Sequence, residues 1–198
     1  MRDDIEAALR RLDLALRDPK QFEAAWREDG RLEDGSLGVW VGRPVPGALE
    51  ALAAEHEELV GAPLDPMLRA LWGRFDGIAI APRSAGAAAA PGELAYHDVL
   101  AIGEPSIWPV ARYGSHFDLL DVELPDGGQA CTFGDVADSG FLVVSHHDHA
   151  VYWQDIESHL VPPHRVATNV AAFLDAWIDA SLSVPRLLGR VGASGWGA

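Results

Sequence analysis

The sequence predicts an α+β fold, in which helices pack on a mostly antiparallel sheet and a C-terminal helix closes the domain. Apolar residues recur at helical spacing in residues 4–75 and again in residues 169–182. Between these two regions, short apolar runs are separated by turn residues, as is typical of strands joined by hairpins. The chain has 198 residues, which is the size of one ordinary domain.

The first 47 residues predict a helical extension and a linker. Ile5, Leu9, Leu12 and Leu16 share one face of a helix over residues 4–17. Asp18-Pro19 ends that helix, because a residue before proline avoids the helical region. A short second helix stops near Gly30, and residues 30–47 are rich in glycine and proline, so that we expect a linker or an edge hairpin with a short strand at 37–41.

Two further helices begin the main domain. The first covers residues 48–60 and ends at Gly61, and His56 on its apolar face is expected to be half-buried and hydrogen-bonded. Asp65 is expected to cap the next helix, with Pro66 at its first position, where no N–H is needed. The buried face of that helix consists of Leu68, Leu71, Trp72 and Phe75.

The middle of the chain predicts strands. They are expected at residues 78–80, 94–102, 108–113, 117–124, 129–133, 141–145 and 151–153, and the Ala-rich segment 81–93 is expected to be a surface loop. The final helix starts near Thr168 or Asn169 and buries Phe173, Leu174 and Trp177. Beyond Pro185 the sequence shows little pattern.

Charge and composition exclude several classes of protein. Thirty acids oppose 15 Lys and Arg, for a formal net charge of -15, which disfavours nucleic-acid binding and favours a basic protein partner. No secretory signal is expected from the charged N-terminus, and no apolar run reaches the ~18 residues of a membrane helix. The single cysteine, Cys131, is expected to pack as a small apolar group. Together these observations favour a cytoplasmic protein.

Three motifs, in order, make residues 48–182 similar to the SUKH superfamily, which includes bacterial toxin-immunity proteins and a fungal cell-wall-synthesis regulator. The first is a helix followed by PLDPMLRALWGRFDG, and the second is FGD at 133–135, followed by the apolar strand FLVV. The third is VYWQD at 151–155, followed by a loop and a helix of the type AAFLDAWI. The Ala-rich loop 81–93 and the additional N-terminal helix depart from the family pattern.

This resemblance implies an α+β domain over residues 48–182, flanked by the extension 1–47 and a tail at 183–198. It also implies a protein without catalytic residues or cofactors that binds another protein. In bacteria, such domains commonly neutralise a toxin, often a nuclease, and steric blockade by acidic loops would be the mechanism.

The HHDH sequence at residues 146–149 is the best candidate for a metal site. His147 and His149 would share one face if they lay on a strand, as imidazole ligands of a metal must. Only these two ligands can be placed together, however, and a polar turn between two apolar strands explains the same residues. We therefore expect no tightly held ion, and a small metal-dependent enzyme or metal sensor is the alternative function.

Other catalytic chemistry has no clear sequence support. The acid pairs Asp118/Asp121 and Asp135/Asp138 are expected to be surface charges rather than the carboxylates of a glycosidase. No G-x-S-x-G elbow, P-loop or dinucleotide fingerprint is present. The sequence therefore favours a protein that is not an enzyme.

The partner-binding surface is expected on the sheet and its loops, because acids outnumber bases there. The residues assigned to it are Asp98, Glu104, Trp108, Asp118, Asp121, Asp135 and Asp138. Trp108 would be an apolar anchor within an acidic rim. Residues 2–31 instead mix arginine with acids, so that their field largely cancels beyond a Debye length of about 8 Å. A third interpretation of the same charge pattern is that the protein is an acidic regulatory scaffold.

Overall fold

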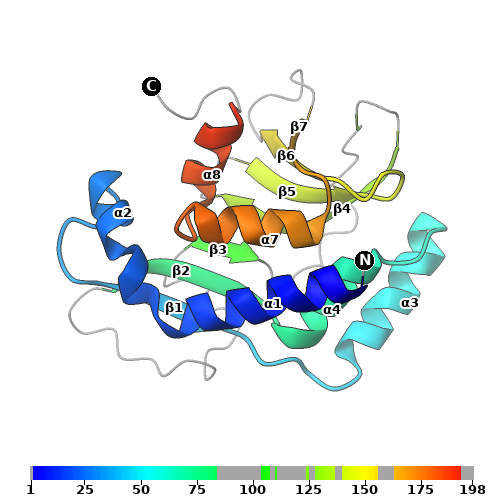
Figure 1. Cartoon of the computed structure of the whole chain (residues 1–198). Coiled ribbons are helices and arrows are strands. Elements are labelled where there is room, and N and C mark those ends of the chain that lie inside the picture. The colour runs from blue at the N-terminus through cyan, green and yellow to red at the C-terminus, as the bar shows by residue number, and fades with distance from the viewer. Residues whose placement is uncertain are drawn as a thin grey trace.

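The computed structural model describes residues 2–83, 104–107, 110, 124, 128–136, 140–155 and 163–192 (Figure 1). The helices are α1 (Arg2–Arg17), the 3-10 helix η1 (Pro19–Phe22), α2 (Glu23–Glu28), α3 (Ala48–Val60), α4 (Pro66–Arg74), α7 (Val170–Asp179) and α8 (Val184–Val191). The strands are β1 (Ser36–Val41), β2 (Ile78–Arg83), β3 (Glu104–Ile107), β4 (Ala130–Val136), β5 (Gly140–Ser145), β6 (Val151–Asp155) and β7 (His164–Ala167).

The predicted α+β class is confirmed, and the described strands form two antiparallel sheets rather than one. The first sheet has the order β1-β2-β3 and the second has the order β4-β5-β6-β7. Strands β3 and β4 lie close together, so the two sheets are neighbours. The predicted strands at 94–102, 108–113 and 117–124 fall almost wholly outside the described residues, as does the Ala-rich loop after Arg83.

Helices α1 and α7 lie side by side in front of the sheets and contribute to one continuous core (Figure 1). Trp177 and Phe173 are fully buried, as the helical spacing predicts, and their rings stack 6.1 Å apart. The rings of Phe133 from β4 and Phe173 meet edge to face, with their centroids 5.5 Å apart. The guanidinium of Arg11 in α1 pairs with Asp175 and Asp179 on the outer face of α7.

The N-terminal region is part of the same core as the rest of the domain. Leu9 and Leu12 of α1 are buried in the cluster that contains Trp177, and β1 pairs along its length with β2. The Trp26 indole of α2 donates a hydrogen bond to the carbonyl of Ser181, just beyond α7. The boundary expected at residue 47 therefore does not divide two cores.

Three elements were not predicted from the sequence, and one of them, β3, lies between the strands expected at 94–102 and 108–113. Helix α8 occupies the tail that was expected to lack pattern, and it buries Leu187 and Leu188 beneath a Ser183 cap. Strand β7 extends the second sheet in a segment where no strand was expected. All three are short, and their apolar residues are too few for periodicity to reveal them.

Candidate functional site

The candidate site is the point where the β5–β6 turn meets α3 and the start of α4. We call it the histidine junction and define it by His56, Asp65, His146 and His149. These side chains come from α3, from the start of α4 and from a turn that follows much later in the sequence. Within the junction, Asp65 Oδ2 and His149 Nδ1 lie 2.8 Å apart, and the ring centroids of His56 and His146 lie 4.9 Å apart.

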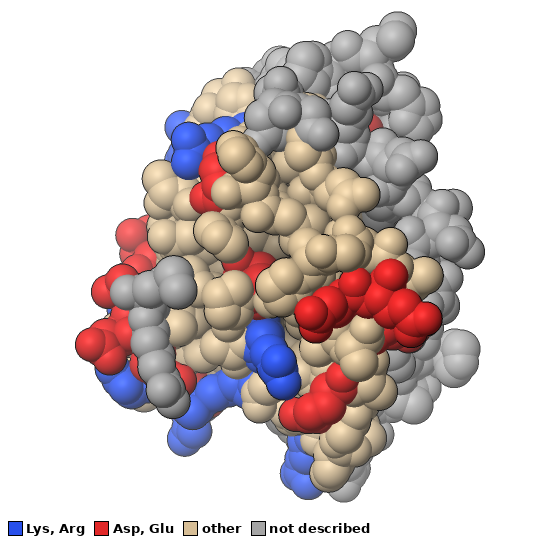
Figure 2. All heavy atoms as spheres, turned by 90° about the vertical axis from the view of Figure 1, so that its right-hand side faces the viewer, with Lys and Arg blue, Asp and Glu red and all other residues tan. Residues whose placement is uncertain are grey.

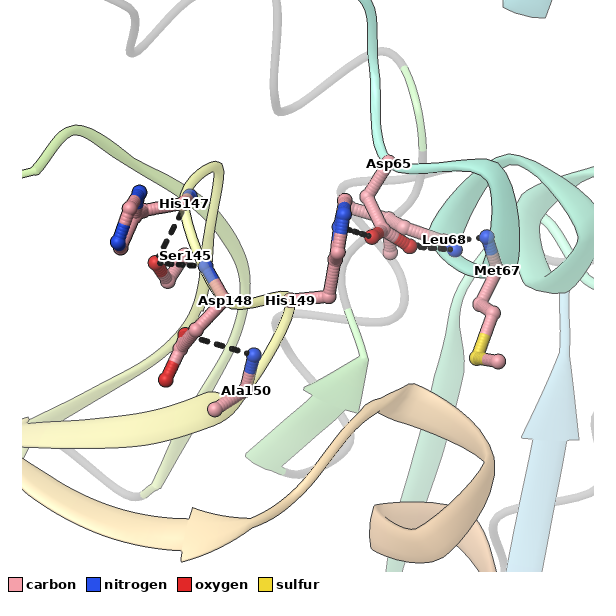
Figure 3. Close-up of polar contacts among 8 residues, drawn as sticks. All are labelled: Asp65, Met67, Leu68, Ser145, His147, Asp148, His149 and Ala150. Atoms are coloured by element: carbon pink, nitrogen blue, oxygen red, sulfur yellow. Dashed lines mark hydrogen bonds and ion pairs between the residues drawn. The ribbon is translucent and has the colours of Figure 1, made fainter. Parts of the chain in front are cut away.

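The turn itself is built by its own polar side chains (Figure 3). Ser145 Oγ accepts hydrogen bonds from the backbone N–H groups of His147 and Asp148, at 3.1 Å and 3.3 Å. The Asp148 carboxylate accepts from the N–H of Ala150 at 3.0 Å. His149 has a φ of 60°, a left-handed conformation that is uncommon for a residue other than glycine. The backbone therefore turns sharply here and directs the His149 side chain away from the strands.

Asp65 joins this turn to helix α4. Its Oδ1 accepts from the N–H groups of Met67 and Leu68, at 2.8 Å and 2.9 Å, which is the helix cap expected from the sequence. Its Oδ2 lies 2.8 Å from Nδ1 of His149, which must be the donor because a carboxylate oxygen accepts. One carboxylate, only 3% exposed, thus holds both a helix end and a turn that lies 84 residues later.

His56 and His146 form the inner part of the junction. Their ring centroids are 4.9 Å apart, and Nδ1 of His56 donates to the carbonyl of Ala62 at 3.1 Å. Burial lowers the pKa of His56, although the Ala62 carbonyl and Glu57 act in the opposite direction. Burial also lowers the pKa of His146, and His56 lowers it further. Both rings are therefore neutral near pH 7, and His56 is more deeply buried than the sequence suggested.

The junction does not have the arrangement of a metal centre. His147 and His149 project from opposite sides of the turn, so the shared face that a strand would have provided is absent (Figure 3). Within the described ranges, no three His, Cys, Asp or Glu side chains are grouped so that they could hold a metal ion. The contacts of His149 instead make it a structural partner of Asp65.

Most residues expected to bind the partner cannot be placed in this structure. Asp98, Trp108, Asp118, Asp121 and Asp138 lie outside the described residues. Glu104 begins β3, and Asp135 lies in β4, where it is partly buried.

The described surface adds a feature that was not assigned from the sequence. Helix α3 exposes four acidic residues, Glu50, Glu55, Glu57 and Glu58, and Leu59 at its end is 61% exposed. No Lys or Arg occurs between Arg43 and Arg69. Acidic side chains cluster on the face of the molecule that includes α3 (Figure 2). The absence of basic residues from 44 to 68 was the available sequence signal.

Comparison with known proteins does not identify a family. No protein-family model matches the chain, and no curated protein matches it. Among the described helices, none is both long and apolar enough to cross a bilayer.

Proposed function

We propose that this chain is a non-enzymatic, cytoplasmic protein-binding module whose acidic surface captures a basic protein. The observation that carries the proposal is the acidic outer face of α3, which has no basic residue within its own segment. An acidic surface accelerates the encounter with a positively charged partner and repels the negatively charged backbones of nucleic acids. The exposed Leu59 beside these charges offers apolar contact area.

The resemblance to the SUKH superfamily makes a toxin the proposed partner. The chain would then act as an immunity protein that covers a basic active groove, such as that of a nuclease. This more specific proposal rests on the motifs at residues 63–77, 133–135 and 151–155. A neighbouring gene for a large modular toxin would support it over a regulatory scaffold.

The test begins with affinity capture from the native organism, using three forms of the full chain. The first is the wild type, and the second neutralises the α3 face by Glu55→Gln, Glu57→Gln and Glu58→Gln. The third is a control with the same net charge, in which three exposed acids elsewhere are neutralised by Glu6→Gln, Glu33→Gln and Asp34→Asn. We expect a basic protein to be retained by the wild type and the control but depleted on the α3 variant.

The captured protein then provides the kinetic test. Association should slow for the α3 variant, and its dependence on salt should weaken, because fewer charges steer the encounter. Equal association rates for all three forms, or an acidic binding face on the partner, would contradict the proposed role of α3.

A further inference from the structure

A groove lies between β1 and the C-terminal half of α1 with η1. Its volume is about 640 Å³, within the range of ligand-binding sites. Apolar side chains that line it include Leu16, Val39 and Phe75. The groove runs beside β1, which is an edge strand of the first sheet as far as the described residues show.

The hydrogen-bonding direction of β1 can be read from its end. Gly42, directly after the strand, donates to the carbonyl of Gly77 and accepts from the N–H of Asp76, so its polar groups face β2. Backbone groups alternate in direction along an antiparallel strand. The N–H and C=O groups of Leu37, Val39 and Val41 therefore face away from β2, and all three residues line the groove.

A carboxylate already occupies the first of these outward positions. Glu23 Oε1 accepts from the N–H of Leu37 at 3.2 Å, and this bond is the main cause that lowers the Glu23 pKa. The carboxylate thus stands where the carbonyl of a neighbouring strand would stand. The outward groups of Val39 and Val41 have no backbone partner among the described residues. Such an edge can accept an added strand.

The charges around the groove favour an acidic occupant. Two of its acids are engaged, since Asp13 pairs with Arg17 at 2.7 Å and Glu23 pairs with Arg27 at 3.1 Å. Lys20 and Arg83 are exposed and have no ion pair among the described residues. They leave an excess of positive charge over the remaining acid, Asp18, in a chain whose net charge is -15.

We propose that this groove docks an extended acidic peptide segment of a partner protein, which pairs as an added strand with the outward backbone groups of β1. Backbone pairing provides the affinity, and Lys20 and Arg83 select carboxylates on the bound segment. The site is separate from the acidic face of α3 and does not require it, so the two surfaces would take partners of opposite charge.

The probe is a capped pentapeptide of alternating valine and glutamate, titrated into the full-length protein. Binding is followed by fluorescence anisotropy and by the amide NMR signals of Leu37, Val39 and Val41. We expect saturable binding that shifts these signals, and affinity about tenfold higher than for the peptide with lysine in place of glutamate. Methylation of every peptide nitrogen should abolish binding, because it removes the donors but keeps the side chains.

Two variants locate the interaction. Lys20→Glu with Arg83→Glu should reverse the preference to the lysine peptide, whereas the control Arg10→Glu with Arg69→Glu changes the net charge equally and should keep it. Val39→Pro removes one outward N–H and should weaken binding, provided that its thermal unfolding remains cooperative. The charge-reversal pair lies on the surface and tests the same site if the proline variant fails to fold.

Three results would overturn the inference. One is the absence of saturable binding by either peptide up to about 5 mM, above the range expected of a weak peptide contact. Another is undiminished binding of the methylated peptide. The third is a set of shifted amide signals that excludes β1.

Discussion

Helices α1 and α3 are both amphipathic, but the fold holds them in different ways. Helix α1 buries six apolar residues, Ile5, Ala8, Leu9, Leu12, Ala15 and Leu16. Helix α3 buries only Leu52 and His56, and it reaches the second sheet through the histidine junction. Apolar packing depends little on pH, whereas the buried imidazoles of His56 and His146 have lowered pKa values and gain protons in acid. Attachment of α3 should therefore be weaker and more sensitive to conditions than attachment of α1.

The largest expected effect on stability is at the apolar face of α7, which packs in the same core as α1. Trp177→Ala should lower the free energy of unfolding by about 3–5 kcal/mol, because it leaves a cavity where a fully buried indole packs on Phe173. Urea denaturation measures this change. Leu14→Ala in α1 is the control, since that side chain is 67% exposed and should have an effect of about 0.5 kcal/mol or less. A loss below about 1 kcal/mol for Trp177→Ala would show that α7 does not anchor the core.

A smaller effect is expected at Asp65. Asp65→Ala should cost about 2 kcal/mol, because it removes the cap of α4 and the partner of His149 together. Asp65→Asn keeps a capping oxygen and separates the two roles. A double-mutant cycle with His149→Ala gives their coupling free energy from urea denaturation. Strictly additive changes would mean that the contact between Asp65 and His149 contributes nothing to stability.

The third prediction concerns the pH dependence of the junction. Burial lowers the pKa of His56 and His146 from 6.5, so the unfolded chain binds protons more readily than the folded chain below that pH. The stability that these neutral rings provide is present above pH 6.5 and is lost as the pH falls towards their lowered pKa values. Asp65 favours protonation of His146, and Glu57 favours protonation of His56, but burial outweighs both.

The measurement is the free energy of unfolding between pH 7.5 and pH 5, a range on both sides of the ordinary histidine pKa of about 6.5. In the double variant His56→Gln/His146→Gln, the free energy of unfolding should fall less steeply as the pH decreases. The slope should change by up to about 1.4 kcal/mol per pH unit for each extra proton that the wild-type chain takes up on unfolding. His147→Gln is the control, because that side chain is exposed and outside the junction. A double variant that declines as steeply as the wild type would place the acid sensitivity elsewhere.

The sequence by itself determined the class of the fold and the positions of the longer helices, α1, α3, α4 and α7. From Ile5 to Leu16, apolar residues recur every three or four positions, and this spacing places them on one face of a helix regardless of what packs against that face. The caps at Asp65 and Asn169 are equally local, since each side chain bonds backbone N–H groups two or three residues away. The same kind of periodicity in the last helix predicts the burial of Trp177, which is fully buried.

Only the tertiary structure decided what these faces and turns contact. Asp65 and His149 are separated by 84 residues, and no periodicity in either segment indicates that they meet. The sequence favoured a polar turn at HHDH but did not give the direction of its rings, and the left-handed conformation of His149 sends its ring to the side opposite His147 (Figure 3). The groove beside β1 likewise depends on the packing of α1 against a strand edge. Local sequence sets backbone preferences over a few residues, whereas contacts between distant segments depend on how the core brings them together.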